Sequence, residues 1–378
     1  MEPFRIDIPD ALLQDLKRRL GDTRWPGEIS GGGWDYGSEL GYVKSLCEYW
    51  KNEFDWRDQE RKINSFSNYT TDIDDLNVHF IYEKGKGPDP LPLVITHGWP
   101  STFAEMLDII PMLTDPESHG GSAADSFDVV VPSIPGYGFS QKPELPGMNV
   151  AKVASIWTKL MTKELGYESF VAQGGDWGAA ISTALGALHG DVVQSIHLTM
   201  ASGLTDLDAA LSGDEKKFLE HRTWWQENEG AYGHMQRTKP QTLSYGLNDS
   251  PAGLAAWIVE KWRSWSDCNG TIESRFTKDQ LLTHITIYWV TQTLESSVRL
   301  YYETAHAEPV LGIGGKVEIP TNFASFPVEI AYPPREWIER FYNLRRFSIM
   351  SSGGHFAATE EPSLLADDIR SAFRFLRD

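Results

Sequence analysis

One stretch of the sequence combines a reactive side chain with the small residues that a sharp turn requires. Residues 174–178 read Gly-Gly-Asp-Trp-Gly, so Asp176 has a glycine two positions before it and another two positions after it. The apolar run Phe170–Gln173 precedes the stretch. This pattern is typical of a nucleophile elbow, a strained strand-to-helix turn that projects one side chain beyond the end of a strand. A glycine-rich turn with a helix-capping aspartate is the alternative.

An aspartate at an elbow, where esterases place serine, predicts a different reaction. A carboxylate is a poor nucleophile toward an ester or an amide. It can instead displace a leaving group at a saturated carbon, which gives an ester attached to the enzyme. Backbone N–H groups that stabilise an oxyanion would then serve the second step, when water attacks that ester.

A second motif, His97–Pro100, follows the apolar run Leu93–Thr96. An elbow nucleophile needs one oxyanion donor from this upstream loop and one from the residue after the nucleophile. We therefore expect the backbone N–H groups of Trp99 and Trp177 to form the oxyanion hole. Taken alone, His-Gly-Trp-Pro could also be a turn with a hydrogen-bonded histidine.

The base of such a site should come late in the chain, after the last strand. His355 has this position, in the glycine-rich segment Ser351–Ala358 that precedes the final predicted helix. The acid should follow an intermediate strand, and Glu329, at the end of the apolar segment that begins at Asn322, is our choice. Four other acids stay open: Glu318, Glu336, Asp206 and Asp208. Asp206 and Asp208 could serve if the acid follows the preceding strand instead.

Short apolar runs alternate with helix-length segments through much of the chain. Runs at 92–96, 127–132 and 170–173 are continuous rather than alternating, which predicts strands buried on both faces in a mostly parallel α/β sheet. Residues 206–310 are Trp-rich and helical in pattern, and indicate an insertion over the sheet. Two further helices are predicted near the N-terminus, at 8–21 and 38–54.

Composition narrows the classes of partner. The 378 residues include 53 acidic and 34 basic side chains, a net charge of −19, which disfavours binding to nucleic acid or to an anionic membrane. Cys47 and Cys268 are too few for a disulfide framework or a metal cluster. We expect two unpaired buried thiols in a reducing, cytoplasmic compartment. No run approaches the roughly 18 apolar residues of a membrane span.

These motifs together resemble the microsomal-type epoxide hydrolases. The resemblance covers nearly the whole chain and rests on the segments 4–26, 97–100, 135–140, 174–178, 238–240, 247–254 and 353–358. It implies an α/β-hydrolase fold with helices on both faces of the sheet, a helical lid and an N-terminal helical arm. The implied divisions are an arm at 1–75, a core at 76–205 and 319–378, and a lid at 206–318.

The resemblance also implies two lid tyrosines that hold the epoxide oxygen. One is Tyr232, and for the other we choose Tyr301 over its neighbour Tyr302. A neutral phenol can hydrogen-bond the leaving oxygen and supply its proton. Without the resemblance, both tyrosines would be read as packed aromatic side chains.

The expected activity is the hydrolysis of a small apolar epoxide to a vicinal diol, without cofactor or metal. Mammalian microsomal members carry an N-terminal membrane anchor, whereas this chain starts at the arm, so we expect a soluble protein. A homodimer is one option. A haloalkane dehalogenase could use the same Asp, His and acid, although such enzymes lack the arm and the tyrosine pair. A non-catalytic receptor would not need the base.

Overall fold

A nine-stranded sheet forms the centre of the part of the chain that the structure describes. The computed structural model describes residues 1–201, 210–312 and 314–377. The strands are β1 (Glu2–Pro3), β2 (Asn68–Ile73), β3 (Leu76–Glu83), β4 (Leu91–Thr96), β5 (Phe127–Pro132), β6 (Phe170–Gly174), β7 (Val193–Leu198), β8 (Val317–Ser325) and β9 (Tyr342–Ile349). Their order is β1-β2-β3-β5-β4-β6-β7-β8-β9. The strands from β5 to β9 in this order are parallel and β1 to β3 are antiparallel, which confirms the predicted mostly parallel sheet.

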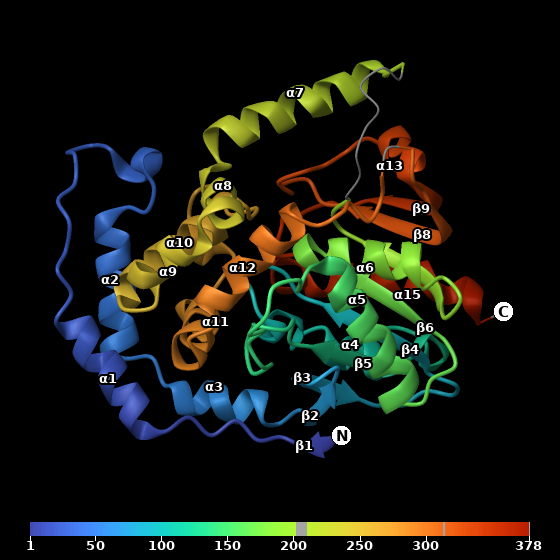
Figure 1. Cartoon of the computed structure of the whole chain (residues 1–378), viewed down its shortest axis with the longest axis horizontal. Helices are drawn as coiled ribbons and strands as arrows, with labels where there is room; N and C mark the ends of the chain where they lie inside the picture. Colours follow the sequence, from blue (N-terminus) through green and yellow to red (C-terminus); the bar gives the residue numbers. More distant parts are fainter. Residues whose placement is uncertain (202–209, 313, 378) are drawn as a thin grey trace.

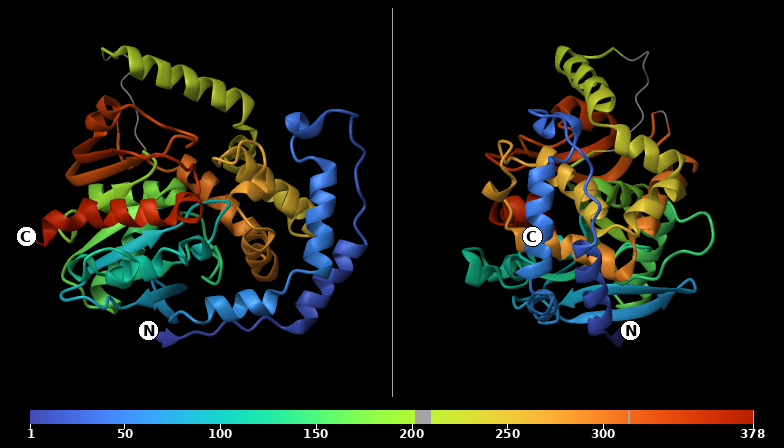
Figure 2. Two further views of the ribbon diagram at one scale, coloured as in Figure 1. Left: turned by 180° about the vertical axis from the view of Figure 1, so that it is seen from behind. Right: turned by 90° about the vertical axis from the view of Figure 1, so that its left-hand side faces the viewer.

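Helices cover both faces of this sheet. They are α4 (Ile110–Thr114), α5 (Val150–Lys159), α6 (Asp176–Leu188), α13 (Arg335–Phe341), α14 (Ala357–Glu360) and α15 (Pro362–Phe373). Helix α5 packs against α6, whereas α15 packs against α4 on the opposite face (Figures 1 and 2). Every residue of β5 and β6 is buried, which explains why these strands read as continuous apolar runs.

The lid is a set of helices inserted between β7 and β8. Its helices are α7 (Gly213–Asn228), α8 (Ala231–Thr238), α9 (Pro240–Leu247), α10 (Pro251–Ser264), α11 (Lys278–Thr291) and α12 (Leu294–Ala305). A core loop fixes α12, because the Tyr137 hydroxyl donates to the Ser297 carbonyl at 3.0 Å and the Ser296 hydroxyl donates to the Gly136 carbonyl at 2.5 Å. The lid is therefore anchored to the sheet at the helix that carries Tyr301.

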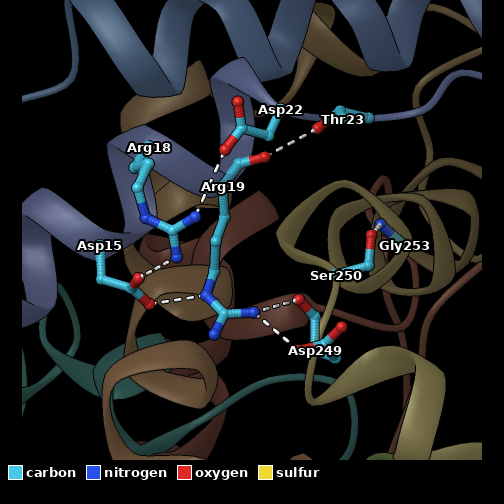
Figure 3. A network of polar contacts seen from close by, with 8 residues as sticks. All are labelled: Asp15, Arg18, Arg19, Asp22, Thr23, Asp249, Ser250 and Gly253. Carbon is cyan, nitrogen blue, oxygen red and sulfur yellow. Dashed lines mark hydrogen bonds and ion pairs between the residues drawn. The ribbon is translucent and has the colours of Figure 1, made fainter.

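The arm lies along the outer side of the lid and returns to the sheet (Figure 2). It consists of α1 (Asp10–Gly21), α2 (Leu40–Asn52) and α3 (Trp56–Ile63). Figure 3 shows its link to the lid: the Arg19 guanidinium donates to Asp15 at 2.6 Å and to the Asp249 carboxylate at 2.7 Å. Deeper in the interface, the Trp50 indole N–H donates to the Thr286 hydroxyl at 2.9 Å.

Three details differ from the expectations drawn from the sequence. Strands β1 and β2, placed within the expected arm, pair with the sheet. Strand β8 begins at Val317, inside the expected lid. Helix α3 was not predicted, because its eight residues are mostly charged and only Trp56, Glu60 and Ile63 are buried.

Two expectations about the chain as a whole can also be compared with the structure. Cys47 and Cys268 are both buried and unpaired, as predicted. Within the described ranges, none of the helices has the length and apolar character that crossing a bilayer requires.

Candidate active site

The elbow at Asp176 is formed by close backbone contacts between neighbouring elements. Strand β6 ends at Gly174 and α6 begins at Asp176, whose φ of +47° lies in the left-handed region that a residue with a Cβ rarely adopts. A Cβ on Gly178 would lie 1.9 Å from the Thr96 carbonyl oxygen. The glycine thus lets α6 approach β4, and the strained turn places the carboxylate beyond the end of the sheet.

The loop after β4 supplies a donor to this carboxylate. The Trp99 backbone N–H donates to Asp176 Oδ1 at 2.8 Å. The Trp177 N–H lies in the first turn of α6, where backbone N–H groups have no acceptor within the helix. Both predicted oxyanion donors are therefore next to Asp176, and only the Trp99 bond is already made to its side chain.

His97 of the same motif has a structural place. Its ring lies between two backbone groups: Nδ1 donates to the Gly98 carbonyl at 3.0 Å, and Nε2 accepts from the Ile134 N–H at 3.2 Å. Burial lowers the pKa of His97 to about 4, so the ring is neutral near pH 7 and can both donate and accept. This histidine ties the Trp99 loop to the segment after β5.

His355 lies between two carboxylates. Its Nε2 is 3.4 Å from Asp176 Oδ2, and its Nδ1 donates to Glu329 Oε1 at 2.6 Å. Burial alone would lower the pKa of His355, but the negative charges of Glu329 and Asp176 outweigh burial and raise it well above the ordinary value. The resting site is therefore an imidazolium held by two carboxylates.

The loop that carries His355 is fixed from the lid side. The His355 backbone N–H donates to the Trp265 carbonyl at 2.9 Å. Glu360 accepts from the Phe356 N–H at 3.0 Å and from the Asp267 N–H at 2.8 Å. These bonds determine where the ring stands relative to Asp176.

Among the acids considered, the structure brings Glu329 to His355. Glu336 instead accepts a hydrogen bond from the Ser212 hydroxyl at 2.8 Å. Glu318 lies on β8, where its backbone carbonyl accepts from Asn343 at 2.9 Å. The remaining two rivals, Asp206 and Asp208, lie outside the described residues.

The two predicted lid tyrosines face each other above the oxyanion tryptophans. The Tyr232 and Tyr301 ring centroids are 6.1 Å apart. Tyr232 stacks on the Trp99 ring at 5.4 Å, and Tyr301 meets the Trp177 ring edge-on at 4.6 Å. Burial, together with the charge of Asp176, raises the pKa of both phenols, so both are neutral and can donate. Tyr302 is 38% exposed and stacks on the His306 ring at 4.0 Å.

A small cavity and a larger groove border the residues of this site from different sides. A cavity of about 20 Å³ is lined by Asp176, His355, Glu105 and other residues, and this is enough for about one water molecule. A groove of about 650 Å³ on the lid surface is lined by Trp225 and the two tyrosines, among others. Water can therefore be held on the side of the carboxylate, while a larger molecule can reach the phenols from the groove.

Two buried residues of this site were not identified from the sequence. The Trp265 ring lies 5.0 Å from the His355 ring and 5.1 Å from the Tyr232 ring. Glu105 lines the small cavity, and burial raises the pKa of its carboxyl to about 7. A lone acid within the otherwise apolar segment Phe103–Met106 was the available signal for Glu105. Trp265 had none, because its neighbours come from distant segments.

Comparison with known proteins agrees with this architecture. A family described as "Epoxide hydrolase N terminus" matches residues 1–106, and one described as "alpha/beta hydrolase fold" matches residues 92–244. Epoxide hydrolase 1 of Oryctolagus cuniculus is 39% identical over 406 aligned residues, which cover 98% of this chain and 88% of that protein. The chain belongs to the epoxide hydrolase family.

The likeness to solved epoxide hydrolases extends over arm, core and lid. The juvenile hormone epoxide hydrolase of Bombyx mori superposes with a TM-score of 0.90 at 31% identity, over 100% of this chain and 95% of that one. The Aspergillus niger epoxide hydrolase gives a TM-score of 0.87 at 28% identity, over 99% and 96%. This epoxide hydrolase therefore shares with them the α/β-hydrolase fold predicted from its sequence.

Proposed function

We propose that this epoxide hydrolase converts an epoxide and water into a vicinal diol through an ester formed on Asp176. The observation that carries the proposal is the different surroundings of the two oxygens of the Asp176 carboxylate. Oδ1 is occupied by the Trp99 N–H at 2.8 Å, while Oδ2 faces His355 at 3.4 Å. One oxygen is thus held as a future carbonyl oxygen, and the other is available to attack.

In the first half-reaction, Oδ2 of Asp176 attacks a ring carbon and the carbon–oxygen bond of the epoxide breaks. The leaving oxygen develops negative charge, and Tyr232 and Tyr301 hydrogen-bond it. One phenol transfers its proton to this oxygen, which leaves a phenolate and an ester between the substrate and Asp176. The neutral state of both phenols supports this role.

In the second half-reaction, His355 takes a proton from a water that attacks the ester carbonyl carbon. Glu329 holds the ring through Nδ1. The Trp99 and Trp177 N–H groups stabilise the negative charge on Oδ1. Collapse of the tetrahedral intermediate expels the diol oxygen, which takes the proton from His355. The proton left on the Asp176 carboxyl passes to His355, which restores the resting imidazolium.

Ester formation also prepares His355 to act as a base. In the resting site the charge of Asp176 contributes to the raised pKa of His355. The ester is neutral, so this contribution disappears and the pKa of His355 falls. His355 then passes its extra proton to the tyrosine phenolate, so the imidazole is free to take a proton from water only after the nucleophile has been consumed.

Isotope transfer tests the covalent route. A single turnover is run in H₂¹⁸O with enzyme in excess over styrene oxide. The ester route gives a diol with almost no label and places ¹⁸O in the peptide that contains Asp176. Direct attack by water, with Asp176 as a base, labels the diol and leaves the peptide unlabelled. The second result would exclude the ester.

Haloalkane dehalogenation is a second candidate, favoured by one observation. The indole N–H groups of Trp99 and Trp177 are buried and have no hydrogen-bond partner within the described residues, and such donors could hold a halide. Chloride release from 1-chlorobutane, with Asp176→Ala as the control, tests this activity. Epoxide turnover without chloride release would exclude it.

A further inference from the structure

A buried ammonium group lies against the face of a lid tyrosine. Lys261, in the last turn of α10, has a side chain only 8% exposed. Its Nζ is 4.9 Å from the Tyr232 ring centroid and 5.9 Å from the Trp265 ring centroid. Burying a lysine charge is costly unless nearby groups compensate it, so the surroundings of Nζ indicate what the charge does.

The compensating groups come from three elements. Glu260, its neighbour on α10, forms an ion pair with it. Glu229 lies at the end of α7. Burial and the charge of Glu260 raise the pKa of its carboxyl, and the nearby Lys261 charge offsets part of this rise. The carbonyl end of α10 also favours a cation in its last turn. The tyrosine and tryptophan faces complete the site.

A cation in this position acts on Tyr232 in two ways. It is attracted to the negative face of the ring, which fixes the orientation of the ring. A positive charge beside the ring also favours negative charge on the phenol oxygen, whereas burial and the charges of Asp176, Glu260 and Glu329 oppose it and raise the pKa of Tyr232. Ring opening requires that charge, because the phenol gives its proton to the leaving oxygen.

We propose that Lys261 is a positioning residue for epoxide opening: it holds the Tyr232 ring in place and stabilises the phenolate formed when the proton leaves. The inference rests on the proposed function and identifies Tyr232 as the phenol that gives up its proton. It assigns Lys261 to the first half-reaction only. Trp265, by contrast, contacts both Tyr232 and His355. A substitution of Trp265 would therefore disturb both half-reactions, whereas a substitution of Lys261 tests the first one.

The test compares two substitutions that keep a long, flexible side chain. Lys261→Met removes the charge, and Lys261→Arg keeps it. Lys261→Met should slow ester formation about 10-fold in single-turnover rapid quench, the loss expected for a desolvated cation–π contact. Hydrolysis of the accumulated ester should change by less than about 2-fold, and Lys261→Arg should restore most of the rate.

The same substitution in the Tyr232→Phe background separates positioning from folding. If Lys261 acts through the phenol, Lys261→Met should then cost less than about 2-fold, because the acting group is already gone. An equal loss in both backgrounds, or equal slowing of both half-reactions, would overturn the inference. Thermal unfolding checks the fold, and Lys261→Gln replaces the Met variant if that variant unfolds.

Failure of the proposed function gives a different pattern. If Tyr232→Phe and Tyr301→Phe both form the ester at the wild-type rate, neither phenol is the proton donor and the proposed mechanism is wrong. If only Tyr301→Phe is slow, the mechanism stands and the inference about Lys261 is wrong. If Tyr232→Phe is slow while Lys261→Met is not, the mechanism stands and the inference about Lys261 is wrong.

Discussion

The two sides of the active site are held by different kinds of contact. On the sheet side, Asp176 has its φ of +47° imposed by the elbow, and the Glu329 carboxylate holds His355 through a hydrogen bond of 2.6 Å. On the lid side, Tyr232 and Tyr301 are held by ring contacts with Trp99, Trp177 and each other. One side is determined by backbone geometry and charge, and the other by aromatic packing.

This difference corresponds to what each side is proposed to do. An atom that forms a covalent bond must be placed within a few tenths of an ångström, and a strained turn achieves this. Groups that hold the oxygen of a variable substrate can be positioned by several ring contacts worth about 0.5–1.5 kcal/mol each. Substitutions on the sheet side should therefore stop a chemical step, whereas those on the lid side should slow one.

The largest effect is expected at His355. His355→Gln should hydrolyse the ester about 10³–10⁴-fold more slowly, the upper part of the range for a general base, while the ester still forms. Intact-protein mass spectrometry should show an adduct of the mass of the substrate. A variant with neither adduct nor activity would place His355 in the first step and contradict the proposed division of labour.

The tyrosines should show the opposite selectivity. Tyr232→Phe and Tyr301→Phe should each slow ester formation about 10²-fold by loss of a proton donor, and the double variant should be nearly inactive. Single-turnover kinetics measures the step directly. Tyr302→Phe is the matched control and should behave like the wild type. Slow Tyr302→Phe with normal Tyr301→Phe would mean that the second tyrosine is misassigned by one residue.

The pH dependence of protein stability tests whether the sheet side of the site stays rigid around the buried Glu105. Burial raises the pKa of its carboxyl from 4.5 to about 7, so the folded protein retains a proton that the unfolded chain has lost. Stability should therefore fall as pH rises between these values, by at most about 3 kcal/mol. Glu105→Gln should reduce this slope in denaturant titrations between pH 4 and pH 8.

The exposed Glu117 on the neighbouring segment provides the control for that measurement, and Glu117→Gln should leave the slope unchanged. An unchanged slope in Glu105→Gln would mean that the sheet side relaxes and lets water reach the carboxylate.

The smallest effect is expected where the arm meets the lid. Arg19→Ala removes the bonds to Asp249 seen in Figure 3, but a partly exposed ion pair contributes only about 0.5–1 kcal/mol. The thermal midpoint should fall by only about 1 °C in a chain of this length, and ester formation should stay within about 2-fold. Arg18→Ala, whose partners Asp15 and Asp22 lie within the arm, should change the midpoint less.

The sequence by itself determined the parts of the molecule that depend on local geometry. An elbow needs glycine where a Cβ would collide with nearby backbone, which is Gly178 for a Cβ on Gly174 and Thr96 of β4 for a Cβ on Gly178. These two glycines therefore mark Asp176 in the sequence. Continuous apolar runs marked the strands buried on both faces, and the glycine-rich loop marked His355. Each of these constraints acts over a few residues, and for that reason it leaves a short and readable pattern.

Only the tertiary structure decided which of several similar side chains meet. Glu329 rather than Glu318 or Glu336 reaches His355, and Tyr301 rather than Tyr302 joins the ring group, because the packing of β8 and α12 sets the directions of these side chains. Glu105 and Lys261 became visible only through burial. Burial and charge proximity are produced by segments far apart in the chain, so no short stretch of sequence records them.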